Sequence, residues 1–326
     1  MIRKLFTLFA ALSVLALSGM PAPAAQGYPE RPITIVVPFG AGGETDLVAR
    51  MLADNMHTIF GQNVVVQNIV GAAGVTGMSA ITSAKPDGYT LGVVPSAPLA
   101  MHPHMRQVPY SLESFEFIGR ILKAPYIVLV NKTSPWKTFD DMIKDMKANP
   151  DKYFWASSGV GSVPYIALMN LFNEFGVKVK HVPFSGDADA LQAMAGDRAQ
   201  IYASTAGVLG KYDVKGLALL DAERDPLLPD LPSIKECVPA DKQQWASMLY
   251  VSQWMALIGP KGLPADVLAK LNAAMGQACA APEFVADLKK LGLVPGYQDS
   301  KACEAFIREE SDRNAVTIKK LMQQQQ

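Results

Sequence analysis

ITIVVPFGAGGETDLVAR, residues Ile33–Arg50, predicts a buried strand that breaks into a glycine loop and then opens a helix. The strand Ile33–Val37 is apolar and largely β-branched, and the glycines of Gly40–Gly43 allow a tight turn after it. We expect Thr45 or Asp46 to cap the helix. Free N–H groups at such a turn, together with the helix dipole, favour an anion. The stretch therefore predicts a place for a carboxylate or a phosphate.

An ordinary strand-to-helix turn is the alternative interpretation of this loop, since such turns are common in α/β proteins. The glycines at 40, 42 and 43 do not have the G-x-G-x-x-G spacing of a dinucleotide fingerprint, and no G-x-x-x-x-G-K-[ST] motif follows them. The sequence thus gives no support for nucleotide binding.

The N-terminal residues 1–25 have the pattern of a secretory signal peptide. Arg3 and Lys4 precede an apolar stretch from Leu5 to Leu17, and the small residues Ala22–Ala24 suit cleavage. No cysteine lies there to carry a lipid, and no later apolar run approaches the roughly 20 residues of a membrane span. We expect an exported, soluble product.

Charge and length limit the classes of function and the number of lobes. Loss of Arg3 and Lys4 from 30 basic residues leaves 28 against 30 acidic ones, a net charge near −2 that argues against nucleic-acid binding. The remaining ~300 residues exceed what one core normally organises, so we expect two lobes. The three cysteines, Cys237, Cys279 and Cys303, are an odd number, and Cys279 could pair with Cys303.

The body of the chain alternates strands and helices, which indicates an α/β protein with a mainly parallel sheet. The expected strands are 64–66, 89–94, 126–130, 153–156, 179–182 and 199–203. The expected helices are 78–84, one that begins within 134–139 and ends near 148, 163–175, 188–195, 264–280, 282–291 and 301–322. The last three helices should dock an apolar face on the first lobe.

Small and hydroxyl residues follow these strands in two sets. The loops at Gly40, Gly71 and Ser96 belong to the first half, and those at Ser157, Gly186 and Ser204 belong to the second. Each loop alone is explained by helix capping. Two sets are expected if two sheets face each other across a polar, donor-rich cleft.

The same residues carry a family resemblance. The chain resembles the extracytoplasmic solute receptors of the tripartite tricarboxylate transporter class, the TctC or Bug family. The matching segments are 28–33, 38–43 with Asp46 and Arg50, 86–91, 156–159, 161–162, 181–184 with Gly186, 231–233, and Trp254 before Gly259-Pro260.

This resemblance implies a type II periplasmic binding-protein fold with a ligand cleft between two lobes. The first lobe would comprise residues 26–125 plus 254–326, and the second residues 126–253. The loops expected to hold one ligand carboxylate, partly through water, supply Phe39, Gly40, Ala41, Gly42, Gly43, Thr45, Asp46, Gly71, Ala72, Ala73 and Gly74, with Ser96 nearby. The distal end of the ligand would meet Ser157, Ser158, Ser162, Gly186, Asp187, Ser204 and Thr205.

The implied protein is a monomeric periplasmic receptor without a cofactor, and it would deliver a small organic acid to membrane permease subunits after the lobes close. A ligand-binding sensor read by a membrane sensor kinase is the alternative. The segment Val70–Gly74 lacks the proline and one glycine usual in the family, and Ser204 stands where an aspartate is common. We therefore expect a mono- or dicarboxylate with an apolar or aromatic body rather than an amino acid, although Glu44 and Asp187 could hold an ammonium group.

Other chemistry finds little support in the sequence. His102-Pro103-His104 lacks nearby Cys or acidic ligands, so we expect a surface loop rather than a metal site. No G-x-S-x-G motif frames Ser157 or Ser158, although a triad assembled in space needs no such motif. We expect the protein not to be an enzyme.

Overall fold

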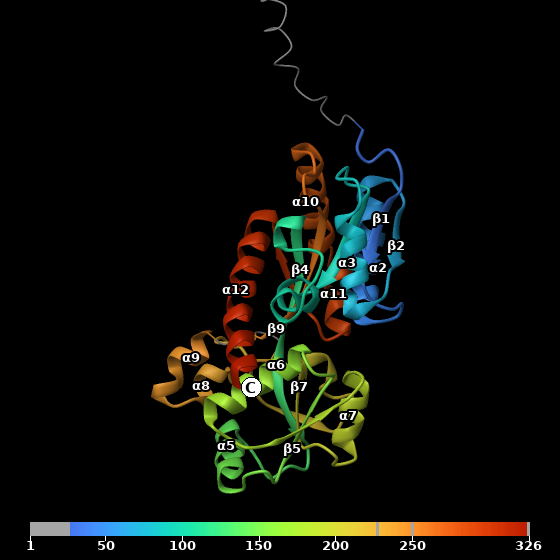
Figure 1. The fold of residues 1–326 in the computed structure, drawn as a ribbon. Coiled ribbons are helices and arrows are strands. Elements are labelled where there is room, and N and C mark those ends of the chain that lie inside the picture. Colours follow the sequence, from blue (N-terminus) through green and yellow to red (C-terminus); the bar gives the residue numbers. More distant parts are fainter. Residues whose placement is uncertain (1–26, 226–227, 249–250, 325–326) are drawn as a thin grey trace, which may run out of the picture.

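The computed structural model describes residues 27–225, 228–248 and 251–324, so the predicted signal peptide lies outside the described residues. The chain forms two α/β lobes, which lie one above the other in Figure 1. Two long strands, β4 (Phe115–Asn131) and β9 (Ser252–Pro260), lie where the lobes meet.

The strands follow the order β2-β1-β3-β9-β4-β7-β5-β6, and β8 and β10 also pair with β4. The first lobe contains β1 (Ile33–Val37), β2 (Val64–Asn68), β3 (Thr90–Pro95) and β10 (Val294–Gln298). The second contains β5 (Phe154–Ser157), β6 (Lys180–Pro183), β7 (Ile201–Thr205) and β8 (Val214–Leu219). Strands β1, β2 and β3 pair in parallel, as do β5, β6 and β7, which matches the expected α/β class.

Strand β4 changes partners along its length. Residues 115–125 pair with β9, and residues 126–131 pair with β7 and β8. The predicted lobe boundary at Tyr126 coincides with this change of partner. The assignment of residues to two domains on that basis stays a prediction.

Helices cover both faces of the sheet in the first lobe. Successive side chains of β1 point to opposite faces of the sheet. Ile33 and Ile35 therefore pack in one apolar cluster, and Val36 packs in another on the other face. The first cluster packs under α2 (Glu44–Phe60), α10 (Ala265–Ala280) and α11 (Pro282–Lys290). The second packs under α3 (Val75–Thr82), the π-helical turn η3 (Ala97–Met101) and α12 (Ser300–Gln324).

The second lobe repeats this layering. Helices α5 (Phe139–Ala148) and α6 (Val163–Phe175) bury their apolar faces in one cluster, around Trp155, and α7 (Asp187–Ala195) packs into another, around Tyr202. The short helices are η2 (Ala72–Gly74), α4 (His102–Met105), η4 (Leu112–Ser114), η5 (Ala206–Val208), α8 (Ile234–Cys237), η6 (Ala240–Lys242) and α9 (Gln243–Met248).

Helix α12 contacts more of the molecule than the sequence predicted. It contacts β4, η3 and α4, and also α6 of the second lobe. Its Ile318 is buried in the apolar cluster of that lobe. The last helix therefore packs against both lobes rather than the first alone, whereas α10 and α11 stay with the first lobe.

Several element boundaries differ from those expected. Gly43, not Thr45 or Asp46, is the N-cap of α2, so both predicted caps lie inside its first turn. Ser204 and Thr205 lie within β7 instead of in a loop after it. Strands β8, β9 and β10 and the first half of β4 were not predicted, because their sequences show no regular alternation and β10 contains Pro295 and Gly296.

The cysteines are not paired. All three thiols are free, which corrects the possible Cys279–Cys303 bond. The physical reason is that Cys279 packs among the residues under α2 and Cys303 among those under α3, on opposite faces of the sheet. Burial raises the pKa of each of these two thiols to about 12.

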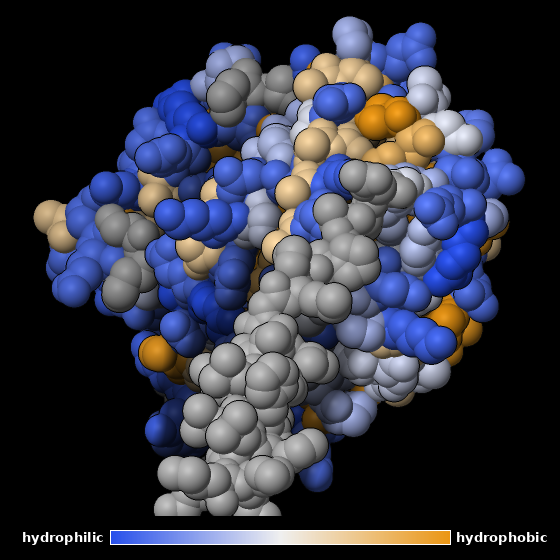
Figure 2. All heavy atoms as spheres, turned by 90° about the horizontal axis from the view of Figure 1, so that it is seen from above, coloured by the Kyte–Doolittle hydropathy of each residue, from blue (hydrophilic) through white to orange (hydrophobic). Residues whose placement is uncertain are grey.

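The surface carries no large apolar band on the face shown in Figure 2, where hydrophilic residues predominate and hydrophobic ones gather in small patches. Within the described ranges, no helix is both long and apolar enough to cross a membrane.

Candidate functional site

The glycine loop before α2 is held by Asp46. Its buried carboxylate accepts hydrogen bonds from the Gly42 N–H at 2.8 Å, from Arg50 Nε at 2.9 Å and from Asn68 Nδ2 at 2.9 Å. The Arg50 guanidinium is the main reason that the pKa of Asp46 is lowered to about 2. The Gly43 N–H points back to the Gly40 carbonyl. Asp46 therefore shapes the loop, and the Gly42 and Gly43 N–H groups are occupied within it.

The second loop, Gly71–Gly74, has an uncommon backbone. All four residues have positive φ, including Ala72 at 46° and Ala73 at 53°, a left-handed conformation that normally favours glycine. The Ala72 carbonyl accepts a hydrogen bond from Arg106 Nη2 at 3.1 Å. Such strained positions persist where the surroundings hold them, and they often lie at binding sites.

A cavity of about 650 Å³ lies between the lobes. The first lobe lines it with Phe39, Thr45, Ala73, Pro95, Ser96, Ala97, His102, Met105 and Arg106. The second lobe lines it with Ser158, Val160, Gly161, Ser162, Val163, Pro164, Ser185 and Asp187, and the crossing strands add Tyr126 and Gln253. Its size and its mixture of apolar walls with a few polar groups suit a small organic ligand.

A polar chain connects the crossing strands with α2 at one wall of this cavity. Tyr126 Oη donates to Gln253 Oε1 at 3.2 Å, and Gln253 Nε2 donates to Glu44 Oε1 at 2.5 Å. Burial, and then the nearby charge of Asp187, raise the pKa of Glu44 to about 7. The negative charge of Glu44, which lies behind Gln253 at this wall, therefore varies near neutral pH.

Arg106 and His102 form a second polar group. Arg106 Nη2 donates to His102 Nδ1 at 2.9 Å, which assigns the proton of that ring to Nε2. Burial, followed by the Arg106 charge, lowers the pKa of His102 to about 4, so the ring is neutral at pH 7. This finding corrects the expectation of a surface loop at His102-Pro103-His104, because His102 is buried and lines the cavity.

Seven of the predicted site residues line the cavity: Phe39, Thr45, Ala73, Ser96, Ser158, Ser162 and Asp187. The others do not line it, namely Gly40, Ala41, Gly42, Gly43, Asp46, Gly71, Ala72, Gly74, Ser157, Gly186, Ser204 and Thr205. Ligand contact by any of these residues stays a prediction.

Sequence reasoning missed the lining residues whose neighbours give no motif. Tyr126 and Gln253 lie in crossing strands, and only their place in the fold brings them to the cleft. Arg106 follows the His102-Pro103-His104 segment, whose unusual chemistry was the available signal. Met105 reaches across the cleft, because a Cβ atom placed on Gly161 would lie 2.3 Å from its Cε.

The side chains of Ser157 and His181 are in contact, and this contact has a structural role. Ser157 Oγ lies 2.7 Å from His181 Nε2, a contact also seen between a nucleophile and its base. Ser157 is completely buried, however, and the His181 ring lies 4.1 Å from the Trp155 ring. Neither side chain lines the cavity, so this contact supports packing rather than catalysis.

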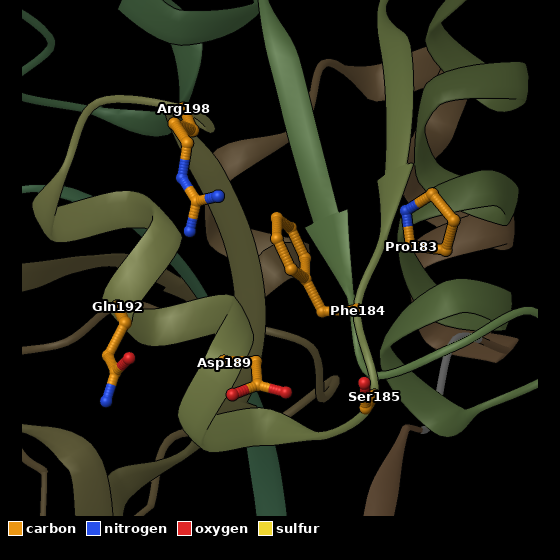
Figure 3. A pocket seen from close by; sticks show the side chains of 6 residues that line it. All are labelled: Pro183, Phe184, Ser185, Asp189, Gln192 and Arg198. Atoms are coloured by element: carbon orange, nitrogen blue, oxygen red, sulfur yellow. The ribbon is translucent and has the colours of Figure 1, made fainter.

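A second, smaller depression of about 420 Å³ adjoins the cleft at Ser185, which lines both (Figure 3). Figure 3 shows Asp189 and Gln192 on α7 at one side and Phe184 at the centre. The Arg198 guanidinium lies 5.7 Å from the Phe184 ring centroid. Arg198 therefore packs against a residue of its own lobe.

Comparisons with known proteins agree with the fold. The family model described as the tripartite tricarboxylate transporter family receptor matches residues 48–322. The chain is 31% identical to a protein from the gbd 5′ region of Cupriavidus necator, covering 96% of this chain and 94% of that one. It is 30% identical to the protein BugT of Bordetella pertussis, covering 94% of both.

Solved structures give the same result. A TctC solute-binding protein from Polaromonas superposes with a TM-score of 0.78 at 26% identity, covering 90% of this chain and 99% of that one. MatC from Rhodopseudomonas palustris with bound malate has a TM-score of 0.72 at 28% identity, over 89% and 100% of the chains. Rpa4515 of R. palustris with adipate has a TM-score of 0.74 at 25% identity, over 89% and 98%. The expected two-lobed binding-protein fold is confirmed by these likenesses.

Proposed function

The chain belongs to the tripartite tricarboxylate transporter receptor family, and on that premise we propose that it is a periplasmic receptor for a small organic carboxylate. In this proposal it holds the acid between its lobes, releases it to membrane permease subunits, and performs no chemistry on it. The cavity of about 650 Å³, lined by both lobes, is the observation that carries the proposal.

Three further observations support it. Malate and adipate, the acids bound by two structural relatives, are both small carboxylates. The cavity lining combines hydroxyl side chains such as that of Ser158 with the cationic side chain of Arg106. Its apolar wall, which includes Phe39, Met105 and Val160, can cover a hydrocarbon body.

The proposed mechanism is closure of the lobes on the ligand. Val160 is 70% exposed although it lines the cavity, so the loop that carries it has apolar surface to bury when an acid fills the cleft. A ligand that contacts both lobes favours the closed form over the open one. The permease would then distinguish the loaded receptor from the empty one by shape.

A thermal-shift screen tests this proposal. The mature protein is unfolded and refolded to remove any bound acid, and is then mixed at millimolar concentration with aliphatic dicarboxylates, tricarboxylates, aromatic acids and amino acids. A micromolar ligand would add about 4 kcal/mol to the free energy of unfolding. A shift confined to one class of acid supports a receptor, whereas no shift with any acid contradicts the carboxylate assignment.

A further inference from the structure

The cavity carries one formal charge from each lobe. Among its described lining residues, Arg106 is the one with a permanent positive charge, and Asp187 is the one carboxylate. Arg106 follows α4 in the first lobe, and Asp187 begins α7 in the second. His102 also lines the cavity but is neutral at pH 7, so it does not alter this balance.

Arg106 is held in place by two hydrogen bonds and keeps other N–H groups that no described residue accepts. Its Nη2 atom makes both hydrogen bonds described above, to the Ala72 carbonyl and to His102. Within the part of the chain that the structure describes, its Nε and Nη1 atoms have no hydrogen-bond partner, and no ion pair involves Arg106. A guanidinium that lines a cavity and keeps unpaired N–H groups is suited to bind a carboxylate.

Asp187 is placed in a comparable way on the opposite lobe. Tyr202 Oη donates to its Oδ1 atom at 2.5 Å, which fixes the carboxylate while leaving Oδ2 available. No ion pair of Asp187 occurs among the described residues. Glu44 does not line the cavity, but its charge and that of Asp187 repel each other, so the negative charge near this wall increases when Glu44 is ionised. Arg106 and Asp187 thus face a common cavity without pairing with each other.

We propose that the ligand is zwitterionic, with its carboxylate on Arg106 and a protonated amine on Asp187. The proposal rests on the receptor function above and narrows its ligand class to amino acids and related amino-carboxylates. A dicarboxylate would place its second anion beside Asp187, whereas an ammonium group there forms a charge-assisted hydrogen bond. A zwitterion also connects the two lobes through both of its ends, which favours closure. This inference reverses the expectation against an amino-acid ligand that the uncharged Ser204 suggested.

Matched pairs of acids test the proposal. Refolded protein is titrated calorimetrically with glutarate and glutamate, valerate and 5-aminovalerate, and 3-phenylpropionate and phenylalanine, so that each pair differs by one amine and the panel varies its distance from the carboxylate. We expect at least one aminated acid to bind ten-fold or more tightly than its partner. If the acid without the amine binds as well or better in every responding pair, the zwitterion proposal is wrong while the receptor function stands. If no acid binds, both are wrong.

Two substitutions test which residue binds each end of the ligand. Asp187→Asn should remove the preference for the aminated acid and leave its partner's affinity unchanged or improved, whereas Arg106→Gln should weaken both members of the pair ten-fold or more. Asp189→Asn, on the same helix but outside the cavity, and Arg198→Gln, beside Phe184, are the matched controls and should bind as the parent does. Circular dichroism confirms that each variant is folded. An unchanged preference in Asp187→Asn overturns the proposal.

Discussion

Trp254 Nε1 donates a hydrogen bond to Glu310 Oε2 at 2.6 Å, and both side chains are buried. The bond connects the crossing strand β9 to helix α12. Burial outweighs this bond and raises the pKa of Glu310 to about 8. A structural carboxylate is therefore kept protonated at neutral pH beneath the C-terminal helix.

Replacing Glu310 should change how stability depends on pH. Because the folded-state pKa is raised from its ordinary value of 4.5 to about 8, Glu310 contributes stability that is fully present below pH 4.5 and is lost as the pH rises through 8. Glu310→Gln keeps an acceptor for Trp254 without the ionisation. We expect the free energy of unfolding in urea to fall less between pH 5 and pH 8 in this variant than in the parent. An equal fall in both proteins would contradict the account.

Asp46→Asn should loosen the glycine loop. The amide cannot accept all of the hydrogen bonds that Gly42, Arg50 and Asn68 donate, so a loss of about 1–3 kcal/mol is expected. The pKa of Asp46 is lowered from 3.8 to about 2, so its contribution is present above pH 3.8 and disappears as the pH falls through 2. Asp54→Asn, exposed on the same helix, is the control, and equal denaturation midpoints for the two variants would contradict this role.

Gly42→Val should strain the same loop from the backbone. Gly42 has φ of 79°, and no atom lies within 4 Å of the position that a Cβ would take. The cost is therefore conformational rather than steric, about 1–3 kcal/mol for a β-branched residue in this region. Gly40→Val also points into open space but at an ordinary φ, so chemical denaturation should show the smaller loss for that variant. Similar losses would show that the left-handed turn is not what makes position 42 sensitive.

Ser204→Asp should lower the stability of the fold rather than change ligand affinity directly. Ser204 is 2% exposed within β7, where it pairs with Ile127, and it does not line the cavity. Its paired residue, Ile127, offers no cation to a carboxylate at position 204, and burying an unpaired charge costs several kcal/mol. We expect a large fall in the midpoint of thermal unfolding and little change in Ser204→Ala. A folded Asp variant with altered ligand affinity would instead place Ser204 in the binding site.

Glu44 should make binding of an aminated acid sensitive to pH. Its pKa of about 7 reflects burial and the charge of Asp187 on α7, with Gln253 and Lys211 opposing the rise. Above pH 7 the ionised carboxylate adds to the attraction for an ammonium group, so affinity should rise between pH 6 and pH 8. Glu44→Gln should flatten this profile. A parent protein whose affinity is constant over the range would contradict the role of Glu44.

Much of the fold followed from the sequence because local patterns determine its parallel units. The helix 163–175 was predicted at its observed bounds, since Ser162 caps it, Pro164 opens it and Gly176 ends it. The crossing strand β9 was not, because its apolar residues are buried on both faces and show no alternation. The role of α12 against both lobes depends on tertiary packing that no local pattern specifies.

The site was predictable as a set of loops but not as a set of charges. Ser158, Ser162 and Asp187 follow strands of one lobe, so the carboxyl ends of those strands predicted their place in the cleft. Asp46, which was expected to meet the ligand, bonds to its own loop, since an acid four residues from Arg50 on a helix pairs with it locally. Arg106 reaches the cavity through a π-helical turn and a short helix that the sequence did not reveal.

Calorimetric titration of the refolded protein with the best acid of the thermal screen shows whether the acid binds in the cavity between the lobes. The parent is compared with Ser158→Phe, which fills the space between the lobes, and with Thr58→Phe, which adds the same side chain on an exposed part of α2. We expect one carboxylate to bind per chain in the parent and in Thr58→Phe, and no heat of binding for a folded Ser158→Phe. Unchanged binding by Ser158→Phe would show that the acid does not occupy the cavity between the lobes.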